Sequence, residues 1–299
     1  MPKIEEGTLE FRDYPVWYRI AGEKDSSTHP PVLCLHGGPG ASWDYLESYE
    51  DLVESGRQVV FYDQLGCGNS AIDSAHDPEM WTVELFVEEI GAVRQALGLD
   101  RVHILGQSWG GMLAMQYALT EPTGLLSLII ESSPASMPQW VAEANKLRAL
   151  LPAQVEETLR LHEEAGTTDD LAYVGAMLVF YQRHLCRLDP WPEYVQRSFE
   201  KLLGNPEVYN VMNGPSEFHV IGTLKEWDIT SRLGEIAVPT LVLSGRYDEA
   251  TPAIAETVHR GIKGSEWVLF EESSHMCHAE ERARCMQVVS NFLHGVEVG

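Results

Sequence analysis

The feature that most constrains the fold is a short segment in which an apolar run ends at a serine flanked by glycines. Residues 101–105 form the run, the pattern Gly106-x-Ser108-x-Gly110 follows, and residues 111–118 read as a helix. A turn this sharp strains its central residue and brings backbones close together, so its neighbours must lack a Cβ. It also lifts the Ser108 hydroxyl clear of a sheet and aims the first helix amides at the group that Ser108 attacks. The segment predicts a nucleophile, and an incidental serine in a glycine-rich turn is the alternative.

The rest of the chain predicts a parallel, doubly wound sheet, because apolar strands alternate with helices. Short strands are expected at residues 8–11 and 16–20, and buried strands at 31–35, 58–63, 125–131, 239–245 and 266–270. Helices are expected at residues 43–55, 82–97, 252–262 and 278–294. Between residues 134 and 233 no clear strand occurs, and helices are expected at 139–151, 154–165, 170–187 and 191–203. We therefore expect a core of residues 1–133 and 234–299 and a helical lid of residues 134–233.

Two further residues stand at strand ends where partners for Ser108 belong. Asp248 follows the strand at 239–245, and His275 follows the strand at 266–270. Ligands in open α/β sheets bind at the carboxyl ends of the strands, and the chain order Ser, Asp, His is that of the α/β-hydrolase fold. Alone, Asp248 could be a turn residue, and His275 is one of 11 histidines. Together, the three positions predict an α/β-hydrolase fold with a Ser108–His275–Asp248 triad.

The glycine-rich loop from His36 to Gly40 follows the strand at 31–35. In this fold such a loop presents one backbone N–H to the developing oxyanion, and the residue after the nucleophile presents the other. We therefore predict an oxyanion hole made by the amides of Gly38 and Trp109, with a plain Gly-Pro turn as the alternative.

Composition limits the partners and the compartment. The net charge of −24 argues against nucleic acid and anionic membrane surfaces. The five cysteines are odd in number and lack CxxC spacing, and neither a signal peptide nor a membrane span is evident, so we expect a cytoplasmic protein. His36 and His278 lack acidic neighbours at ligand spacing, so we expect no metal and no cofactor. Oligomeric state is not predicted.

The loop at 36–40, the segment Gly106–Gly111 and the segment Asp63–Ser70 together resemble the proline iminopeptidases, which are serine aminopeptidases of the α/β-hydrolase fold. The segment Asn213–Phe218 is similar to the branch with the tricorn-interacting aminopeptidase and bacterial amino-acid amidases. In that branch two glutamates hold the free α-amino group of the substrate, and the matching positions are Glu217 and Glu249. The physical argument agrees, because an ammonium group brought under a lid loses water and needs carboxylate partners. For either glutamate alone, a solvated surface acid is the alternative.

This resemblance implies an aminopeptidase that releases proline or another small or apolar residue from short peptides or amino-acid amides through an acyl-enzyme. An amidohydrolase that removes an aminoacyl group from a small metabolite remains open, as do a serine esterase and a ligand sensor. The segment at 63–70 is expected to support the Gly38 loop without a catalytic role. Trp140, Tyr181 and Tyr209 are among the lid aromatics that could line a pocket, although packing against the core is the alternative.

Overall fold

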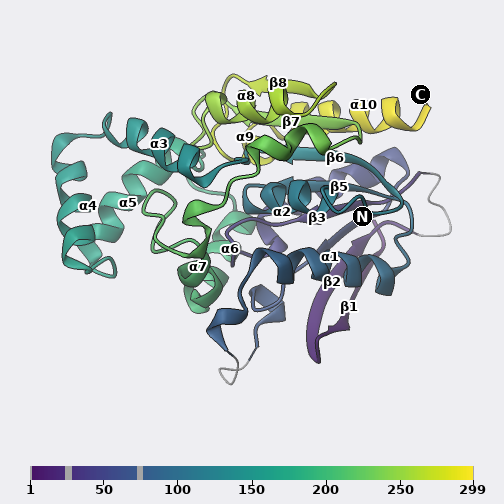
Figure 1. Cartoon of the computed structure of the whole chain (residues 1–299), viewed down its shortest axis with the longest axis horizontal. Helices are drawn as coiled ribbons and strands as arrows, with labels where there is room; N and C mark the ends of the chain where they lie inside the picture. The colour runs from purple at the N-terminus through teal and green to yellow at the C-terminus, as the bar shows by residue number, and fades with distance from the viewer. Residues whose placement is uncertain (1, 24–28, 73–76, 299) are drawn as a thin grey trace.

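The computed structural model describes the whole chain except residues 1, 24–28, 73–76 and 299. Its centre is an eight-stranded sheet in the order β1-β2-β4-β3-β5-β6-β7-β8 (Figure 1). The β1/β2 and β2/β4 pairs are antiparallel, and every later pair is parallel. The predicted doubly wound, mostly parallel sheet is confirmed.

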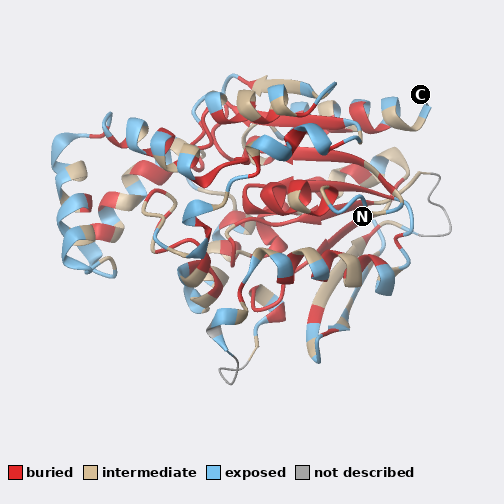
Figure 2. Cartoon of the chain, in the orientation of Figure 1, coloured by how far each residue is buried: buried red, intermediate tan, exposed pale blue. Residues whose placement is uncertain are grey.

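The strands are β1 (Ile4–Phe11), β2 (Tyr14–Ala21), β3 (Val32–Leu35), β4 (Val59–Tyr62), β5 (Val102–Gln107), β6 (Leu125–Glu131), β7 (Thr240–Gly245) and β8 (Glu266–Phe270). Strands β3, β4, β5 and β7 are buried along their whole length, as a parallel sheet covered on both faces requires (Figure 2).

Alternate residues of each central strand enter different hydrophobic clusters on the two faces of the sheet. Leu33 and Leu35 belong to the cluster beneath α1 (Val83–Leu97), α2 (Trp109–Ala118) and α8 (Pro252–Gly261). Val32 and Cys34 belong to the opposite cluster, beneath the 3₁₀ segment η1 (Trp43–Ser55) and α10 (Arg282–Val298). This period of two fixes the register of the sheet and so the position of every strand end.

A helical segment lies between β6 and β7. Its helices are α3 (Met137–Arg148), α4 (Ala153–Ala165), α5 (Leu171–His184), α6 (Glu193–Gly204) and α7 (Glu207–Met212), followed by the short turns η4 (Thr223–Glu226) and η5 (Thr230–Glu235). Figure 1 shows α3, α4 and α5 beyond one end of the sheet, and Figure 2 shows exposed residues along α4. No helix in the described part of the chain is long and apolar enough to cross a membrane.

Three local features differ from the sequence predictions. The segment at 43–55 is 3₁₀ rather than α-helical, and its buried Trp43, Leu46, Tyr49 and Leu52 recur every third residue, which is the 3₁₀ period. The helix expected at 278–294 is divided into α9 (Cys277–Glu280) and α10, because Glu281 between them accepts hydrogen bonds from the Ser273 hydroxyl and the Glu272 amide. The six-residue α7 was not predicted, since so short a helix has little periodicity.

Candidate active site

Ser108 occupies a strained turn between β5 and α2. Its φ of 56° and ψ of −124° lie in a region that side chains rarely adopt. Its own amide donates to the Glu131 carbonyl at 2.9 Å, which anchors the turn to β6. A Cβ at Gly110 would come within 2.0 Å of the Leu35 carbonyl oxygen, so a glycine is required there. The turn leaves Ser108 8% exposed at the floor of a cavity.

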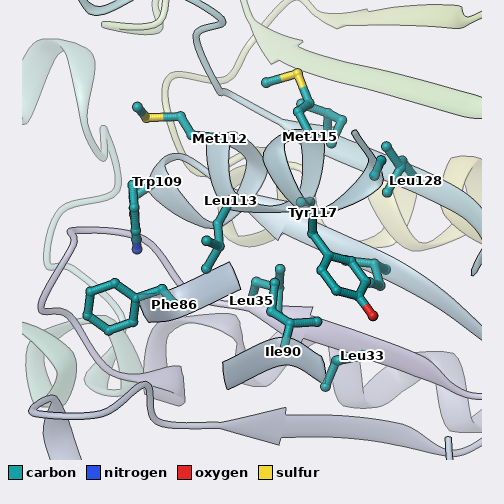
Figure 3. Close-up of a cluster of buried hydrophobic side chains, with 14 of the residues drawn as sticks. Leu33, Leu35, Phe86, Ile90, Trp109, Met112, Leu113, Met115, Tyr117 and Leu128 are labelled. Atoms are coloured by element: carbon teal, nitrogen blue, oxygen red, sulfur yellow. The ribbon is translucent and has the colours of Figure 1, made fainter. Parts of the chain in front are cut away.

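The helix that follows the serine is held rigidly. Trp109 and Leu113 point from α2 toward Phe86 of α1 and Leu35 of β3 (Figure 3). The indole of Trp109 makes an edge-to-face contact with Phe86 at 5.8 Å between ring centroids, and its Nε1–H donates to Gln64 Oε1 at 2.8 Å. The first turn of α2, which aims its amides at the cavity, is therefore fixed by packing and by a hydrogen bond.

Gln64 and His36 support the glycine-rich loop. The Gln64 amide donates to His36 Nε2 at 2.9 Å, and the Gln64 side-chain NH₂ donates to the His36 carbonyl at 2.8 Å. His36 Nδ1–H donates to the Gly37 carbonyl at 3.0 Å, so the ring is neutral with the proton on Nδ1. Burial lowers the pKa of His36 to about 4, which keeps this arrangement at neutral pH. The segment at 63–70 thus braces the loop.

The two predicted oxyanion donors both line the cavity and are free. Gly38 has a φ of +111°, and a Cβ there would lie 2.6 Å from the Gly40 nitrogen. Within the described residues, neither the Gly38 amide nor the Trp109 amide has a hydrogen-bond acceptor. Both residues line the space next to Ser108. This arrangement suits an oxyanion hole, which needs preorganised, unsatisfied N–H groups.

A buried chain of hydrogen bonds, which was not predicted from the sequence, connects the three loops that carry Gly37, Ser108 and His275. The Tyr45 hydroxyl accepts from the Gly37 amide and donates to Gln107 Oε1, each at 2.6 Å. The Gln107 NH₂ donates to the His275 carbonyl at 3.0 Å. The glycine-rich loop, the serine turn and the histidine loop are therefore connected through two side chains that no local sequence signal marks.

Asp248 and His275 lie together at the carboxyl ends of β7 and β8. His275 Nδ1–H donates to Asp248 Oδ1 at 2.7 Å, and both side chains are almost completely buried. The Ala250 amide donates to Asp248 Oδ1 at 2.7 Å, which helps to hold the carboxylate. His275 and Ser108 line the same cavity, although no hydrogen bond joins their side chains among the described residues.

The helical segment between β6 and β7 reaches both loops through one carbonyl group. The His184 carbonyl, at the end of α5, accepts from the Glu249 amide and from the His275 amide, each at 3.2 Å. His184 Nδ1 also donates to the Tyr247 carbonyl at 2.8 Å. The position of α5 is therefore coupled directly to the acid and histidine loops.

Glu249 and Glu217 bring two further carboxylates to the site. Glu249 is 1% exposed, its Oε1 lies 3.7 Å from His275 Nε2, and neither of its oxygens has a hydrogen-bond partner within the described residues. Glu217, in the segment between β6 and β7, lines the cavity and accepts from the Tyr209 hydroxyl at 2.9 Å. Burial raises the pKa of both carboxyls, and the nearby charge of Glu217 raises that of Glu249 further.

Three acids around His275 raise its pKa. Burial alone would lower the pKa of His275, but the charges of Asp248, Glu249 and Glu217 outweigh burial and raise it to about 9. An imidazole that must act as a base is therefore surrounded by groups that favour the imidazolium. A cation placed between Glu217 and Glu249 would offset this effect.

The cavity has two lobes that share Gly38, Ser108 and Glu217. Counting the space open to solvent, the larger lobe has a volume of about 400 Å³ and the smaller about 250 Å³. His275 and Met276 line only the larger lobe, which continues between Leu185, Phe199 and Leu202. Trp109, Met112, Met137, Trp140 and Leu224 line only the smaller lobe. A wider hollow of about 1320 Å³ lies away from the site, against Tyr18, Gln58 and Leu97.

A buried polar network around Glu131 was also not predicted from the sequence. Glu131 accepts from His278 Nδ1–H at 2.7 Å, from the Tyr49 hydroxyl at 2.6 Å and from the Cys277 thiol at 2.9 Å. His278 Nε2–H donates to the Tyr45 carbonyl at 3.0 Å. Burial alone would raise the pKa of Glu131, but His278 and these donors outweigh burial and lower it. The network links β6, which anchors Ser108, to the helix that follows His275.

Among the described residues, no group of three or more His, Cys, Asp or Glu side chains is arranged to hold a metal ion.

The seven residues predicted from the sequence all lie at or beside the cavity or its histidine. They are Gly38, Ser108, Trp109, Glu217, Asp248, Glu249 and His275.

The chain is similar to known hydrolases along most of its length. The family described as the α/β hydrolase fold matches residues 30–281. The chain is 40% identical to the proline iminopeptidase of Saccharolobus solfataricus, over 98% of this chain and 93% of that protein. It is 42% identical to the proline iminopeptidase of Heyndrickxia coagulans, over 97% of this chain and 99% of that protein.

Two solved structures are similar along almost the whole chain. The crystal structure of VinJ superposes with a TM-score of 0.96 at 44% identity, covering 99% of this chain and all 100% of VinJ. The crystal structure of proline iminopeptidase from Mycobacterium smegmatis superposes with a TM-score of 0.91 at 41% identity, covering 98% of this chain and 99% of that chain.

Proposed function

Because this chain belongs to the proline iminopeptidases, a family of the α/β-hydrolase fold, we propose that it is a serine aminopeptidase. It releases an N-terminal proline, or another small apolar residue, from short peptides or amino-acid amides. The observation that carries the proposal is a pair of carboxylates near His275: Glu249, which is buried, and Glu217, which is half-buried and lines the cavity. A catalytic serine alone would equally suit an esterase, whereas two acids withdrawn from solvent beside the histidine call for a cationic substrate.

In the acylation step, Ser108 Oγ attacks the carbonyl carbon of the N-terminal residue while His275 Nε2 takes the serine proton. Asp248 holds His275 with Nδ1 protonated and stabilises the imidazolium that forms. The carbonyl oxygen becomes an oxyanion and receives hydrogen bonds from the Gly38 and Trp109 amides. His275 then returns the proton to the leaving nitrogen as the C–N bond breaks, which gives a free amine and an acyl-Ser108.

Deacylation repeats these steps with water as the nucleophile. His275 takes a proton from water, the resulting hydroxide attacks the acyl carbon, and the same two amides hold the oxyanion. His275 then protonates Ser108 Oγ as the ester bond breaks, which releases the amino acid and restores the enzyme. The released amine has left the larger lobe, so water has a path to the acyl group.

The substrate's amino group is bound as an ammonium between Glu217 and Glu249. Glu249 has two buried oxygens without partners, so an ammonium supplies the hydrogen bonds that this carboxylate lacks. Glu217 is oriented by the Tyr209 hydroxyl and keeps further acceptor capacity. The ammonium of an N-terminal proline has two N–H donors, one for each carboxylate. Because the two carboxylates select a free ammonium, the enzyme acts as an exopeptidase.

The smaller lobe receives the side chain of the released residue. It is enclosed by Met112, Met137, Trp140 and Leu224, which are apolar over most of their surface. These apolar walls suit a pyrrolidine ring or another small apolar side chain. Trp140 is fixed in this wall because its Nε1–H donates to the Glu217 carbonyl at 2.6 Å.

We place the protein in the cytoplasm with a small peptide or amide as its only required partner. The five cysteines are free and buried, which supports a reducing compartment. The segment at 134–233 acts as the lid, since it supplies Glu217 and the wall of both lobes.

The test is a set of matched arylamides of proline, alanine and phenylalanine, each with the amine free and acetylated, beside a simple aryl acetate. We expect turnover of the free-amine forms, with proline or alanine ahead of phenylalanine and the acetylated forms almost inert. Equal turnover of free and acetylated forms would identify an esterase or a general amidase. No turnover of any compound would favour a ligand sensor.

A further inference from the structure

We infer that the amine released by this enzyme is apolar and bears no free carboxylate beside the scissile bond. Aminoacyl groups on apolar amines, and peptides whose next residue is apolar and not C-terminal, would then be better substrates than free dipeptides. This inference rests on the proposed aminopeptidase function and concerns the other side of the same site.

The position of His275 identifies the lobe that holds the leaving group. His275 must protonate the leaving nitrogen, so that nitrogen has to lie beside Nε2. Of the two lobes, only the larger is lined by His275. The smaller lobe therefore holds the acyl side chain, and the larger lobe holds the group that departs.

The side chains that bound the larger lobe offer a leaving group apolar contact. Leu185, Phe199, Leu202 and Met276 form much of its wall. The polar side chains that also line it are already engaged. Tyr45 and Gln107 bond to each other and to backbone groups, and the Ser198 hydroxyl donates to the Ser42 carbonyl at 3.2 Å. A polar leaving group would lose water here without gaining equivalent hydrogen bonds.

The charges around the larger lobe disfavour a carboxylate in particular. Among the described residues that line it, Glu217 and His275 are the ionisable groups apart from Tyr45, and no lysine or arginine is present. Lys201 and Arg197 of α6 do not line the lobe and are engaged by acids. Lys201 pairs with Asp44 at 2.7 Å, and Arg197 pairs with Asp44 and Glu47. A substrate carboxylate would therefore lie near Glu217 and find no lysine or arginine among these lining residues, and the His275 imidazolium is already paired with Asp248.

The apolar wall also extends toward the surface. Phe199 and Leu202 are partly exposed, so this wall continues from the lobe to the surface. The amino end of the substrate lies between Glu249, which is buried, and Glu217, which is half-buried, so a longer leaving group extends toward these partly exposed side chains. A leaving group larger than one residue can thus remain in contact with apolar side chains along α6.

The experiment compares three prolyl substrates on the wild-type enzyme at neutral pH: prolyl-leucine, prolyl-leucinamide and prolyl-asparaginamide. We expect kcat/KM for prolyl-leucinamide to exceed that for prolyl-leucine by at least about tenfold, because the dipeptide buries an unpaired carboxylate. We expect it to exceed that for prolyl-asparaginamide by about tenfold, because leucine and asparagine are similar in shape but only leucine gains from apolar burial.

Substitutions on α6 test where this selectivity arises. Leu202→Lys places a cation in the larger lobe and should reduce the preference for prolyl-leucinamide over prolyl-leucine by about tenfold, since the carboxylate gains a partner. Leu203→Lys makes the same chemical change one residue along, outside the lobe, and should leave the preference unchanged.

Each outcome is decisive and separable from the proposed function. A wild-type kcat/KM for prolyl-leucine equal to or above that for prolyl-leucinamide would overturn the inference while leaving the aminopeptidase intact. A preference for the asparagine compound would overturn the apolar part alone. If prolyl arylamides were not cleaved either, the proposed function itself would fail.

Discussion

Replacing Glu249 with glutamine should change two activities of this enzyme in opposite directions. Glu249 Oε1 lies 3.7 Å from His275 Nε2, and both groups are buried. Without a substrate ammonium, this carboxylate stabilises the imidazolium that cannot act as a base. With an ammonium bound, the same carboxylate is engaged by the substrate. Glu249 should therefore suppress reactions of substrates that lack an amine and promote those that carry one.

The size of the expected increase in aryl acetate hydrolysis follows from the pKa of His275 and from its distance to Glu249. At a pKa of about 9, about 1% of His275 is neutral at pH 7. Unit charges 3.7 Å apart interact by about 4 kcal/mol at an effective dielectric constant of about 20, which is up to about three pKa units. Even a decrease of one unit would raise the neutral fraction about tenfold. Hydrolysis of an aryl acetate at pH 7 should therefore rise about tenfold or more in Glu249→Gln.

Cleavage of a prolyl arylamide should fall in the same variant. Removing one partner of a buried, hydrogen-bonded charge pair costs about 2–5 kcal/mol, which is about 30-fold or more in kcat/KM. Because only neutral His275 can act as a base, the rate of aryl acetate hydrolysis should increase as the pH rises through the pKa of His275. The midpoint of the wild-type acetate profile should therefore lie near 9, and that of Glu249→Gln should lie lower.

The assay is a pair of pH–rate profiles for both substrates, corrected with Ser108→Ala for hydrolysis that does not use the serine. Glu256→Gln is the matched control, because Glu256 is 44% exposed on α8 and pairs with Arg260. It should leave both profiles unchanged. If Glu249→Gln lowered both activities, or left the acetate profile in place, the role assigned to Glu249 would be wrong.

Three further predictions concern the remaining parts of the site. Gly38→Ala would place a Cβ 2.6 Å from the Gly40 nitrogen at a φ of +111°, so kcat should fall by about 10²–10³ through displacement of an oxyanion donor; an unchanged kcat would remove Gly38 from the oxyanion hole. Glu131→Ala leaves the buried His278 without its partner and should lower the free energy of unfolding by about 3–5 kcal/mol in urea titrations. Because folding lowers the pKa of Glu131, this difference should be full at neutral pH and shrink as the pH falls through that pKa; a difference that did not depend on pH would argue against the ion pair. Chelators should leave activity unchanged, and loss of activity that a divalent metal restores would contradict a metal-free mechanism.

The residues at strand ends were predictable from sequence because the sheet itself fixes their position. Ser108, Asp248 and His275 each follow a short apolar run, and parallel strands bring their carboxyl ends to one edge. The glycines of the serine turn carry a local signal as well, because only glycine fits there. Glu217 and Glu249 were predictable only through resemblance, since a glutamate in a loop has no local signature.

The residues that brace the site were not predictable in the same way. Tyr45 and Gln107 are 62 positions apart, and Glu131 and His278 are 147 positions apart. Such pairs depend on the finished packing of the sheet and leave no periodic pattern. The 3₁₀ form of the segment at 43–55 was missed for a related reason, because over few turns its period of three resembles the 3.6 of an α-helix.

The most direct test of the central claim is to trap the acyl-enzyme. Wild-type protein mixed with a prolyl aryl ester, quenched in acid within the first turnover and digested, should carry one prolyl group on the peptide that contains Ser108. Ser108→Ala should carry none. A prolyl group on any other residue, or turnover by Ser108→Ala at the wild-type rate, would contradict the mechanism and remove Ser108 as the nucleophile.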